Sequence, residues 1–178
     1  MRLPKTTNPI IMRENHPFAT SVPESSQVLI LGSFPGKEST QEKRENDWFY
    51  GANRNQFWKI IELVYDLKLP EKKDRQYLFE KAKIGITDII SSCERKDNSN
   101  SDKNLINKIY NTDILNLIKD RAINRILFTS KTVYKEFTAN FDVPEGVELV
   151  VLPSPSPIYR RLSTSISRIP NSQTPHSR

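Results

Sequence analysis

The residues best suited to chemistry lie in two neighbouring segments. The first is the loop Gly32-Ser33-Phe34-Pro35-Gly36, where glycine and proline favour a tight turn whose backbone N–H groups can hold a carbonyl or a water. The second is the run from Trp48 to Trp58, in which three consecutive aromatic residues adjoin polar amides. Aromatic rings stack on flat bases, so the second segment is typical of a site for a base.

The first loop departs from the phosphate-binding P-loop. That motif has four residues between its glycines and a Ser or Thr after its lysine, whereas three residues separate Gly32 from Gly36 and Glu38 follows Lys37. This mismatch argues against a nucleoside triphosphate site. A tight turn after a strand is the alternative interpretation of the loop.

The second segment has both structural and chemical interpretations. Phe57 and Trp58 begin an apolar helical stripe and are expected in the core. Asn55 is either a helix cap or an amide that orients a water. At least one of the three preceding aromatic residues is expected to stack on a base; these are Trp48, Phe49 and Tyr50.

Hydrophobic periodicity predicts the elements that position these segments. Strands are expected at 27–31, 84–90, 124–129 and 147–152, and helices at 53–66, 74–83, 103–110, 112–120 and 130–140. A polar loop at 91–102 is expected to open on the same edge as the first loop. The alternation of strands and helices predicts an α/β fold with a mainly parallel four-stranded sheet wrapped by helices.

Length and composition indicate one domain. The 178 residues suit a single core, and four prolines before residue 27 predict an extended arm over residues 1–26. In that arm, His16-Pro17-Phe18 is expected to pin the segment by burying Phe18. The domain is expected to span 27–160, and the basic, Ser/Pro-rich tail at 161–178 is expected to be disordered.

Several classes of function are disfavoured. Cys93 is the only cysteine and is accompanied by only two histidines, which argues against a disulfide or a metal site. No apolar stretch reaches the length of a membrane helix or makes a secretory signal, so we expect a cytoplasmic, nucleoid-associated protein. The net charge of +6 is compatible with a polyanionic partner.

Four motifs, taken in order, resemble those of the uracil-DNA glycosylase superfamily. They are the segments 29–36, 50–58, 85–89 and 152–157, which read LILGSFPG, YGANRNQFW, GITDI and LPSPSP. Within the superfamily the chain is most similar to the hypoxanthine (deoxyinosine) DNA glycosylase branch, with the mismatch-specific uracil/thymine enzymes next. The similarity covers roughly residues 16 to 160, as judged by the order and spacing of the motifs.

The resemblance implies a three-layer α/β/α domain around a short parallel sheet, with no metal or organic cofactor. It also implies a DNA repair enzyme, expected to be a monomer, acting on double-stranded DNA with a damaged or mismatched base. Such an enzyme flips the nucleotide out of the duplex and cleaves its glycosidic bond with water, through an oxocarbenium-like transition state. Uracil and hypoxanthine are the expected bases.

The resemblance also assigns the catalytic residues. Better-known branches carry a water-positioning Asp or Asn immediately before the proline of the first loop, but this chain has Phe34. The hypoxanthine branch lacks that group too and uses an asparagine matched here by Asn55. Asn53 is a second candidate, because that branch shows His-Pro where this chain has Ala52-Asn53.

The same resemblance gives expectations for the pocket and the DNA contacts. Asp88 is expected to contact the base edge, or alternatively to cap a helix or turn. The whole expected base pocket comprises Gly32, Ser33, Phe34, Pro35, Gly36, Trp48, Phe49, Tyr50 and Asp88. The expected DNA-binding residues are Ser154, Pro155, Ser156, Pro157, Arg160 and Arg161, with further phosphate contacts from Arg95 and Lys96.

Two rival interpretations remain. Phe34 and Leu152 are apolar where other branches carry working side chains, which favours a weakly active or inactive protein that binds DNA or a nucleobase. An α/β enzyme acting on a free nucleotide or nucleoside is the other rival.

Overall fold

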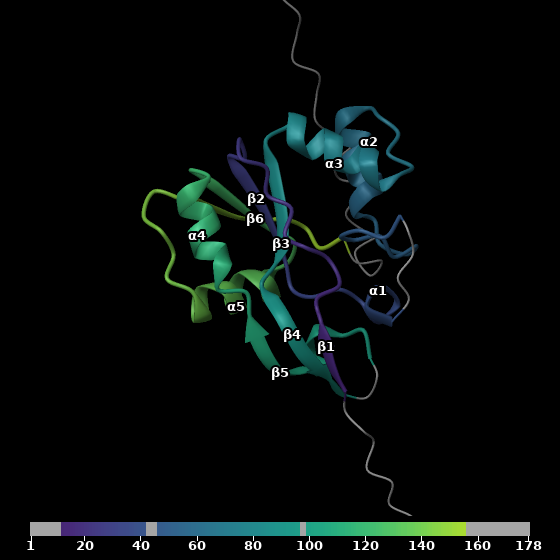
Figure 1. The fold of residues 1–178 in the computed structure, drawn as a ribbon, viewed down its shortest axis with the longest axis vertical. Coiled ribbons are helices and arrows are strands. Elements are labelled where there is room, and N and C mark those ends of the chain that lie inside the picture. Colours follow the sequence, from purple (N-terminus) through teal and green to yellow (C-terminus); the bar gives the residue numbers. More distant parts are fainter. Residues whose placement is uncertain (1–11, 42–45, 97–98, 156–178) are drawn as a thin grey trace, which may run out of the picture.

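The computed structural model describes residues 12–41, 46–96 and 99–155 (Figure 1). Its main sheet has four parallel strands in the order β3-β2-β6-β7, as expected from the alternating pattern. The strands are β2 (Val28–Gly32), β3 (Ile84–Asp88), β6 (Arg125–Phe128) and β7 (Glu148–Val151). The predicted fold class is therefore confirmed.

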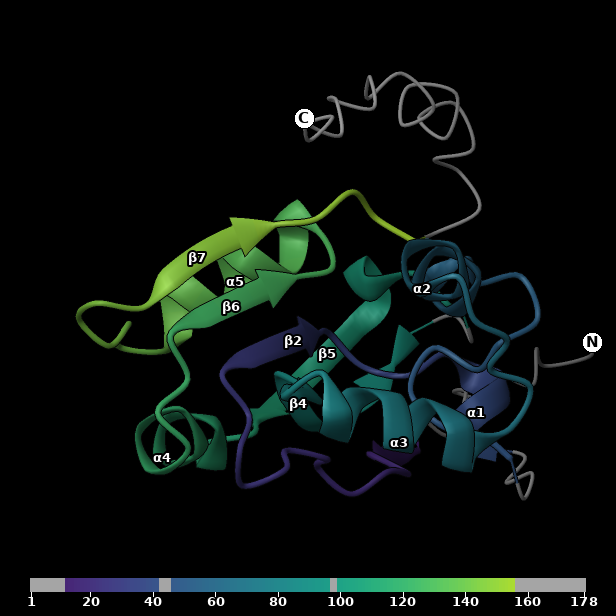
Figure 2. The same ribbon diagram turned by 90° about the horizontal axis from the view of Figure 1, so that it is seen from above.

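Helices cover both faces of this sheet, which gives the three predicted layers (Figure 2). Leu29 and Leu31 of β2 pack with α4 (Asp113–Asp120) and α5 (Lys131–Asn140), whereas Ile30 packs with α2 (Phe57–Tyr65) and α3 (Lys72–Lys81). The split follows from the period of two along a strand, which sends successive side chains to opposite faces. Burying each such side chain stabilises the fold by about 2 kcal/mol.

A second sheet was not predicted. It is antiparallel, with the order β1-β4-β5, and consists of β1 (Arg13–Asn15), β4 (Ile90–Arg95) and β5 (Leu105–Tyr110). The interpretation of 91–102 as a loop is wrong for residues 91–95, and the expected helix at 103–110 is a short 3-10 turn, Asp102–Asn104, followed by β5. The run at 84–90 is two strands, with the buried Ile89 between them.

The helical segments differ from expectation in two further places. A short helix, α1 (Lys37–Gln41), follows the first loop and was not predicted. In α2, Phe57 and Trp58 are buried as expected, but Ile60, Val64 and Tyr65 of the predicted apolar stripe are exposed. No helix in the described part of the chain is long and apolar enough to cross a membrane.

Candidate functional site

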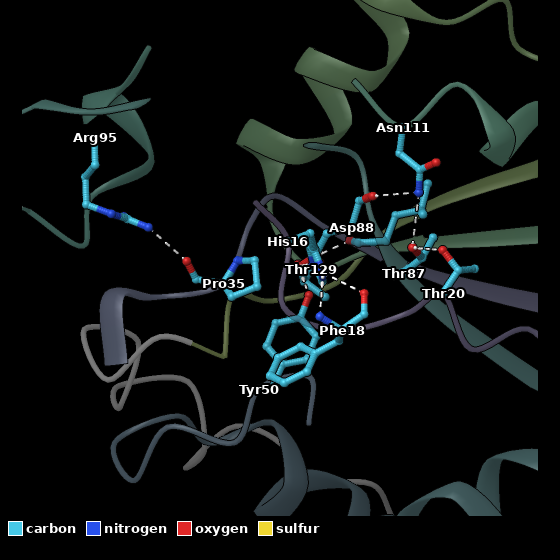
Figure 3. Close-up of polar contacts among 11 residues, drawn as sticks. His16, Phe18, Thr20, Pro35, Tyr50, Thr87, Asp88, Arg95, Asn111 and Thr129 are labelled. Atoms are coloured by element: carbon cyan, nitrogen blue, oxygen red, sulfur yellow. Dashed lines mark hydrogen bonds and ion pairs between the residues drawn. The ribbon is translucent and has the colours of Figure 1, made fainter. Parts of the chain in front are cut away.

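Three strands of the parallel sheet, β2, β3 and β6, end at one edge, and Figure 3 shows Asp88 and Thr129 there beside His16 and Tyr50. Gly32 of β2 is paired in register with Asp88 of β3, and Thr129 directly follows β6 on the other side of β2. The backbone closes the edge, since the Ile89 N–H donates to Gly32 O at 2.9 Å and the Thr129 N–H donates to Leu31 O at 3.1 Å. In open α/β sheets, ligands bind at such carboxyl ends.

Asp88 is a buried carboxylate held by the N-terminal arm. The whole residue is 6% exposed, and His16 Nε2 lies 2.8 Å from Asp88 Oδ2. The imidazole ring packs edge-on against Phe34 and Phe18 and at a tilt against Phe49. A buried carboxylate requires such a partner, because desolvation of an unpaired charge is costly.

Tyr50 reaches the same edge from the aromatic run. Its hydroxyl donates to Thr129 Oγ1 at 3.1 Å, and Thr129 Oγ1 donates in turn to Leu31 O at 3.2 Å. The ring stacks on Phe57 with centroids 4.4 Å apart, and the backbone at Tyr50 has a φ of 58°. Burial, followed by the negative charge of Asp88, raises the pKa of Tyr50 well above its ordinary value, so the phenol stays neutral.

Gly32 lies between these two polar groups. A side-chain carbon at this position would collide with the Tyr50 hydroxyl and with Asp88 Oδ1. The tyrosine oxygen and the carboxylate oxygen therefore converge on space that only a glycine leaves free. The edge of the sheet thus carries a carboxylate, a neutral phenol and a hydroxyl.

Arg95 holds the first loop in place, and the expectation that it contacts phosphate is wrong for this structure. Its guanidinium donates from Nε to Glu14 Oε1 at 3.0 Å and from Nη2 to Pro35 O at 3.0 Å, and its side chain is 3% exposed. Burial alone would raise the pKa of Glu14, but hydrogen bonds from Arg95 and Thr40 lower it below its ordinary value. Lys96, by contrast, is exposed.

The other residues of the first loop form its wall. Phe34 is 7% exposed and belongs to the core, where it packs against His16. Ser33 hydrogen-bonds to Asp102, although burial raises the pKa of that carboxyl overall. Gly36 begins the turn into α1, with its carbonyl accepting from the Ser39 N–H at 3.0 Å. The apolar side chain at position 34 therefore supports His16 from the core.

Asn55 lies one residue before the N-cap of α2, which is Gln56, and its side chain makes an Asx turn at the helix start. Its Oδ1 accepts a hydrogen bond from the Phe57 N–H at 2.8 Å, while Asn53 is exposed. Helix α2 begins at Phe57 rather than at Asn53, so Asn55 serves the first turn. Because a carbonyl oxygen has two lone pairs, this amide oxygen can accept a second hydrogen bond from a water.

The aromatic run divides between core and site. Trp48 and Phe49 are each 2% exposed, and Trp48 stacks on Trp58 with centroids 5.5 Å apart. Neither ring therefore presents an open face for a base. Tyr50 is the member of the three that reaches the strand edge.

The proline-rich loop after β7 lies beside the start of α2. Pro155 is buried and its carbonyl accepts from the Gln56 N–H at 3.1 Å, while Ser154 is half-buried. The loop therefore contacts Gln56, the residue that directly follows Asn55. Ser156, Pro157, Arg160 and Arg161 of the expected DNA-binding set lie outside the described residues.

Two cavities flank the arm. One of about 450 Å³ is lined by residues 12–17 and Thr40, and another of about 210 Å³ by residues 17–21 with Trp48, Lys72 and Gln76. Both lie along the arm that carries His16, and neither is lined by Gly32 or Asp88. Access to the Asp88 carboxylate therefore requires Tyr50 or the arm to move.

Two residues of this edge were missed by the sequence analysis. Thr129 ends a predicted strand, so the rule that ligands bind at strand ends could have identified it. His16 was recognised only as part of a segment that pins the arm. No local signal in the sequence pairs it with a carboxylate of a strand far along the chain.

Comparison with known proteins identifies the family of this chain. Residues 19–171 match a family described as the uracil DNA glycosylase superfamily. A hypoxanthine DNA glycosylase from Methanosarcina barkeri is 28% identical over 120 residues, which is 64% of this chain and 70% of that protein.

The fold is also found among solved structures. A solution NMR structure from Methanosarcina acetivorans, described as a candidate uracil DNA glycosylase, superposes with a TM-score of 0.59 and 22% identity. The match covers 85% of this chain and 90% of that one. At this identity the likeness concerns the fold.

Proposed function

Because the chain belongs to the uracil DNA glycosylase superfamily, we propose that it removes a deaminated base, hypoxanthine or uracil, from double-stranded DNA. Members of this superfamily are DNA glycosylases that hydrolyse N-glycosyl bonds. The observation that carries the choice of base is the buried Asp88 carboxylate at the edge of the sheet. The similarity to a hypoxanthine DNA glycosylase supports the same choice.

Asp88 favours deaminated bases because an ionised carboxylate only accepts hydrogen bonds. Hypoxanthine and uracil carry a ring N–H on the Watson–Crick edge, and this N–H can donate to Asp88. Adenine and cytosine, from which these bases arise, carry a bare ring nitrogen there, whose lone pair would face the carboxylate. Two buried acceptors that face each other disfavour binding strongly. Asp88 alone would therefore bind hypoxanthine and uracil in preference to adenine and cytosine.

The base must leave the duplex to reach this edge. Asp88 is covered by the Tyr50 hydroxyl and by His16 of the arm, so we expect the base to enter by displacing Tyr50 while His16 stays on the carboxylate. A flipped base would then lie between the wall formed by residues 32–36 and the Tyr50 ring. The loop at 153–155 lies beside the start of α2, where its serine can donate to a DNA phosphate.

In the reaction, a water oxygen forms a bond to C1′ of the deoxyribose while the C1′–N bond breaks. The electron pair of that bond stays on the base. The attacking water loses one proton to solvent and the base takes up one proton, so the products are the free base and an abasic site with a hydroxyl on C1′. Asn55 would hold the water through the second lone pair of Oδ1. Backbone N–H groups of the loop at 32–36 would stabilise the departing anion, and no covalent intermediate is required.

The test is a panel of duplexes, each with one hypoxanthine, uracil, xanthine or mismatched thymine. Release of the base, followed by alkaline cleavage of the abasic strand, is expected for hypoxanthine or uracil. An undamaged duplex is the control. The absence of any alkali-labile site across the panel would refute the proposed activity.

A second candidate function is DNA or nucleobase binding without turnover. It is favoured by the contact between Asn55 Oδ1 and the Phe57 N–H, which already uses one lone pair of the expected catalytic oxygen. Salt-sensitive binding to duplexes with a deaminated base, without strand cleavage after alkali, would support it over the first proposal.

A further inference from the structure

The geometry points to His16 as a specificity-determining residue that excludes guanine from the base site. This inference rests on the proposed function, in which Asp88 reads the Watson–Crick edge of a flipped base. Guanine is the normal purine that Asp88 alone cannot reject, because guanine carries the same ring N–H as hypoxanthine. Something else must distinguish the two purines.

His16 occupies one of the two carboxylate oxygens. Its Nε2 lies 2.8 Å from Asp88 Oδ2, and the bond requires the proton on Nε2, since the carboxylate has none to give. The other ring nitrogen, Nδ1, lies 3.2 Å from the Phe18 N–H and 2.9 Å from Phe18 O. Both ends of the imidazole are therefore held in place.

The ring has little freedom to turn away. Phe18, Phe34 and Phe49 each lie within 5.8 Å of it, measured between ring centroids. The His16 side chain is 11% exposed and that of Asp88 is 7% exposed. The Nε2–H group is thus a permanent occupant of Oδ2 rather than one of several partners.

The remaining oxygen, Oδ1, lies on the other side. It lies over Gly32 near the Tyr50 hydroxyl, at the end of the strand where a base would enter. A base at this edge therefore meets a carboxylate with one oxygen turned towards it. The site presents a single strong acceptor.

The number of donors on each base then decides the selection. Hypoxanthine and uracil need one acceptor for their single ring N–H. Guanine carries an amino group next to its ring N–H, and these two parallel donors suit both oxygens of a free carboxylate. With Oδ2 taken by His16, the amino group of guanine is left without its acceptor and faces the imidazole N–H. A buried donor without a partner reduces affinity by about tenfold or more.

The test uses three ligands that differ only at carbon 2. These are 9-methylhypoxanthine, 9-methylguanine and 2,9-dimethylhypoxanthine, in which a methyl group replaces the amino group at similar size. Their dissociation constants are measured by calorimetric titration into the full-length protein. In the wild type, 9-methylguanine is expected to bind no tighter than the dimethyl compound, because its amino group finds no hydrogen-bond acceptor. Binding of 9-methylguanine about tenfold tighter than the dimethyl compound would overturn the inference.

Two variants complete the test. His16→Phe keeps an aromatic ring but frees Oδ2, so 9-methylguanine is expected to gain about tenfold over the dimethyl compound. His16→Gln keeps an N–H donor and is expected to restore the wild-type ratio. Because the ratio compares two ligands on one protein, partial unfolding of a variant cancels from it. An unchanged ratio in a folded His16→Phe protein would contradict the role of His16.

The ligand titration and the duplex panel that tests the proposed function can succeed or fail independently. Titration with free bases does not require turnover, so a protein that fails on every duplex still gives the ligand ratio. Suppose that the protein cleaves hypoxanthine DNA but binds 9-methylguanine more tightly than the dimethyl compound. That result would support the proposed function and contradict the role of His16. If His16→Phe does not fold, the wild-type ligand series decides alone.

Discussion

The hydroxyl of Tyr50 and the carboxylate of Asp88 converge on Gly32, so that a methyl group on Gly32 would overlap both of them. Gly32→Ala is therefore expected to displace Tyr50 or Asp88 and to reduce base excision by at least about 100-fold, the scale of a misplaced reacting group. Gly36→Ala is the matched control, because its new carbon would make ordinary contact with Asn100 Oδ1 at 3.5 Å. Single-turnover rates on a hypoxanthine duplex measure the difference; equal rates for the two variants would contradict it.

Asn55 combines a helix contact with an expected catalytic role, and two substitutions separate them. Asn55→Ala removes both, whereas Asn55→Ser keeps a side-chain acceptor for the Phe57 N–H and loses the amide. Both are expected to slow excision by about 100-fold or more, while only the alanine variant loses about 1 kcal/mol of unfolding free energy. Asn53→Ala, at an exposed position, serves as the control. A rate that falls for Asn53→Ala and not for Asn55 variants would transfer the role to Asn53.

Glu14 and Arg95 link acid stability to the first loop. The pKa of Glu14 is lowered from its ordinary value of 4.5 in the folded protein, so the ion pair stabilises the fold above that pH. This stabilisation is lost as the pH falls through the lower, folded pKa. Glu14→Gln is expected to cost about 3 kcal/mol at neutral pH, because it leaves the buried Arg95 unpaired. The loss of unfolding free energy caused by Glu14→Gln should become smaller as the pH falls through the folded pKa of Glu14.

Urea denaturation at a series of pH values measures this dependence. Glu148→Gln is the control, since its pair with Arg125 is over half exposed on both sides and contributes at most about 1 kcal/mol. Parallel curves for wild type and Glu14→Gln from neutral pH down into acid would show that the pair does not carry the pH dependence.

Tyr50 contributes a hydrogen bond whose loss can be measured apart from its ring. Tyr50→Phe keeps the stacking on Phe57 and removes the donor to Thr129 Oγ1, so it is expected to cost about 1 kcal/mol of unfolding free energy. Tyr77→Phe on the exposed side of α3 is the matched control and is expected to change stability little. Equal denaturation midpoints for the two variants would show that the bond to Thr129 is not stabilising.

The parallel sheet was predictable because its determinants are local. Each strand is a short apolar run, and each crossover helix repeats apolar residues at helical spacing, so periodicity identified both. The family resemblance, rather than periodicity, put Gly32 and Asp88 in one expected pocket, and the two residues are paired in register at the edge of the sheet. The registers between the strands could not be predicted from periodicity and are seen only in the folded structure.

The antiparallel sheet escaped prediction for a physical reason. In β5, Leu105 and Ile106 are followed by Ile109 and Tyr110, a spacing that imitates a helix. The strand tolerates this because its pairing with β4 shifts register twice and Asn107 takes a φ of 49°. Such bulges remove the strict alternation by which a strand is recognised.

The N-terminal arm contacts both sheets and the Asp88 carboxylate. Residues 13–15 complete the antiparallel sheet, Ser21 pairs with Ile86 of the parallel one, and His16 lies between them on Asp88. If His16 has the proposed role, substitutions in the arm that displace it will change base recognition, although they precede every strand of the main sheet. Two chains with identical strand-end motifs are then expected to differ in base selection where one of them lacks a donor at the position of His16.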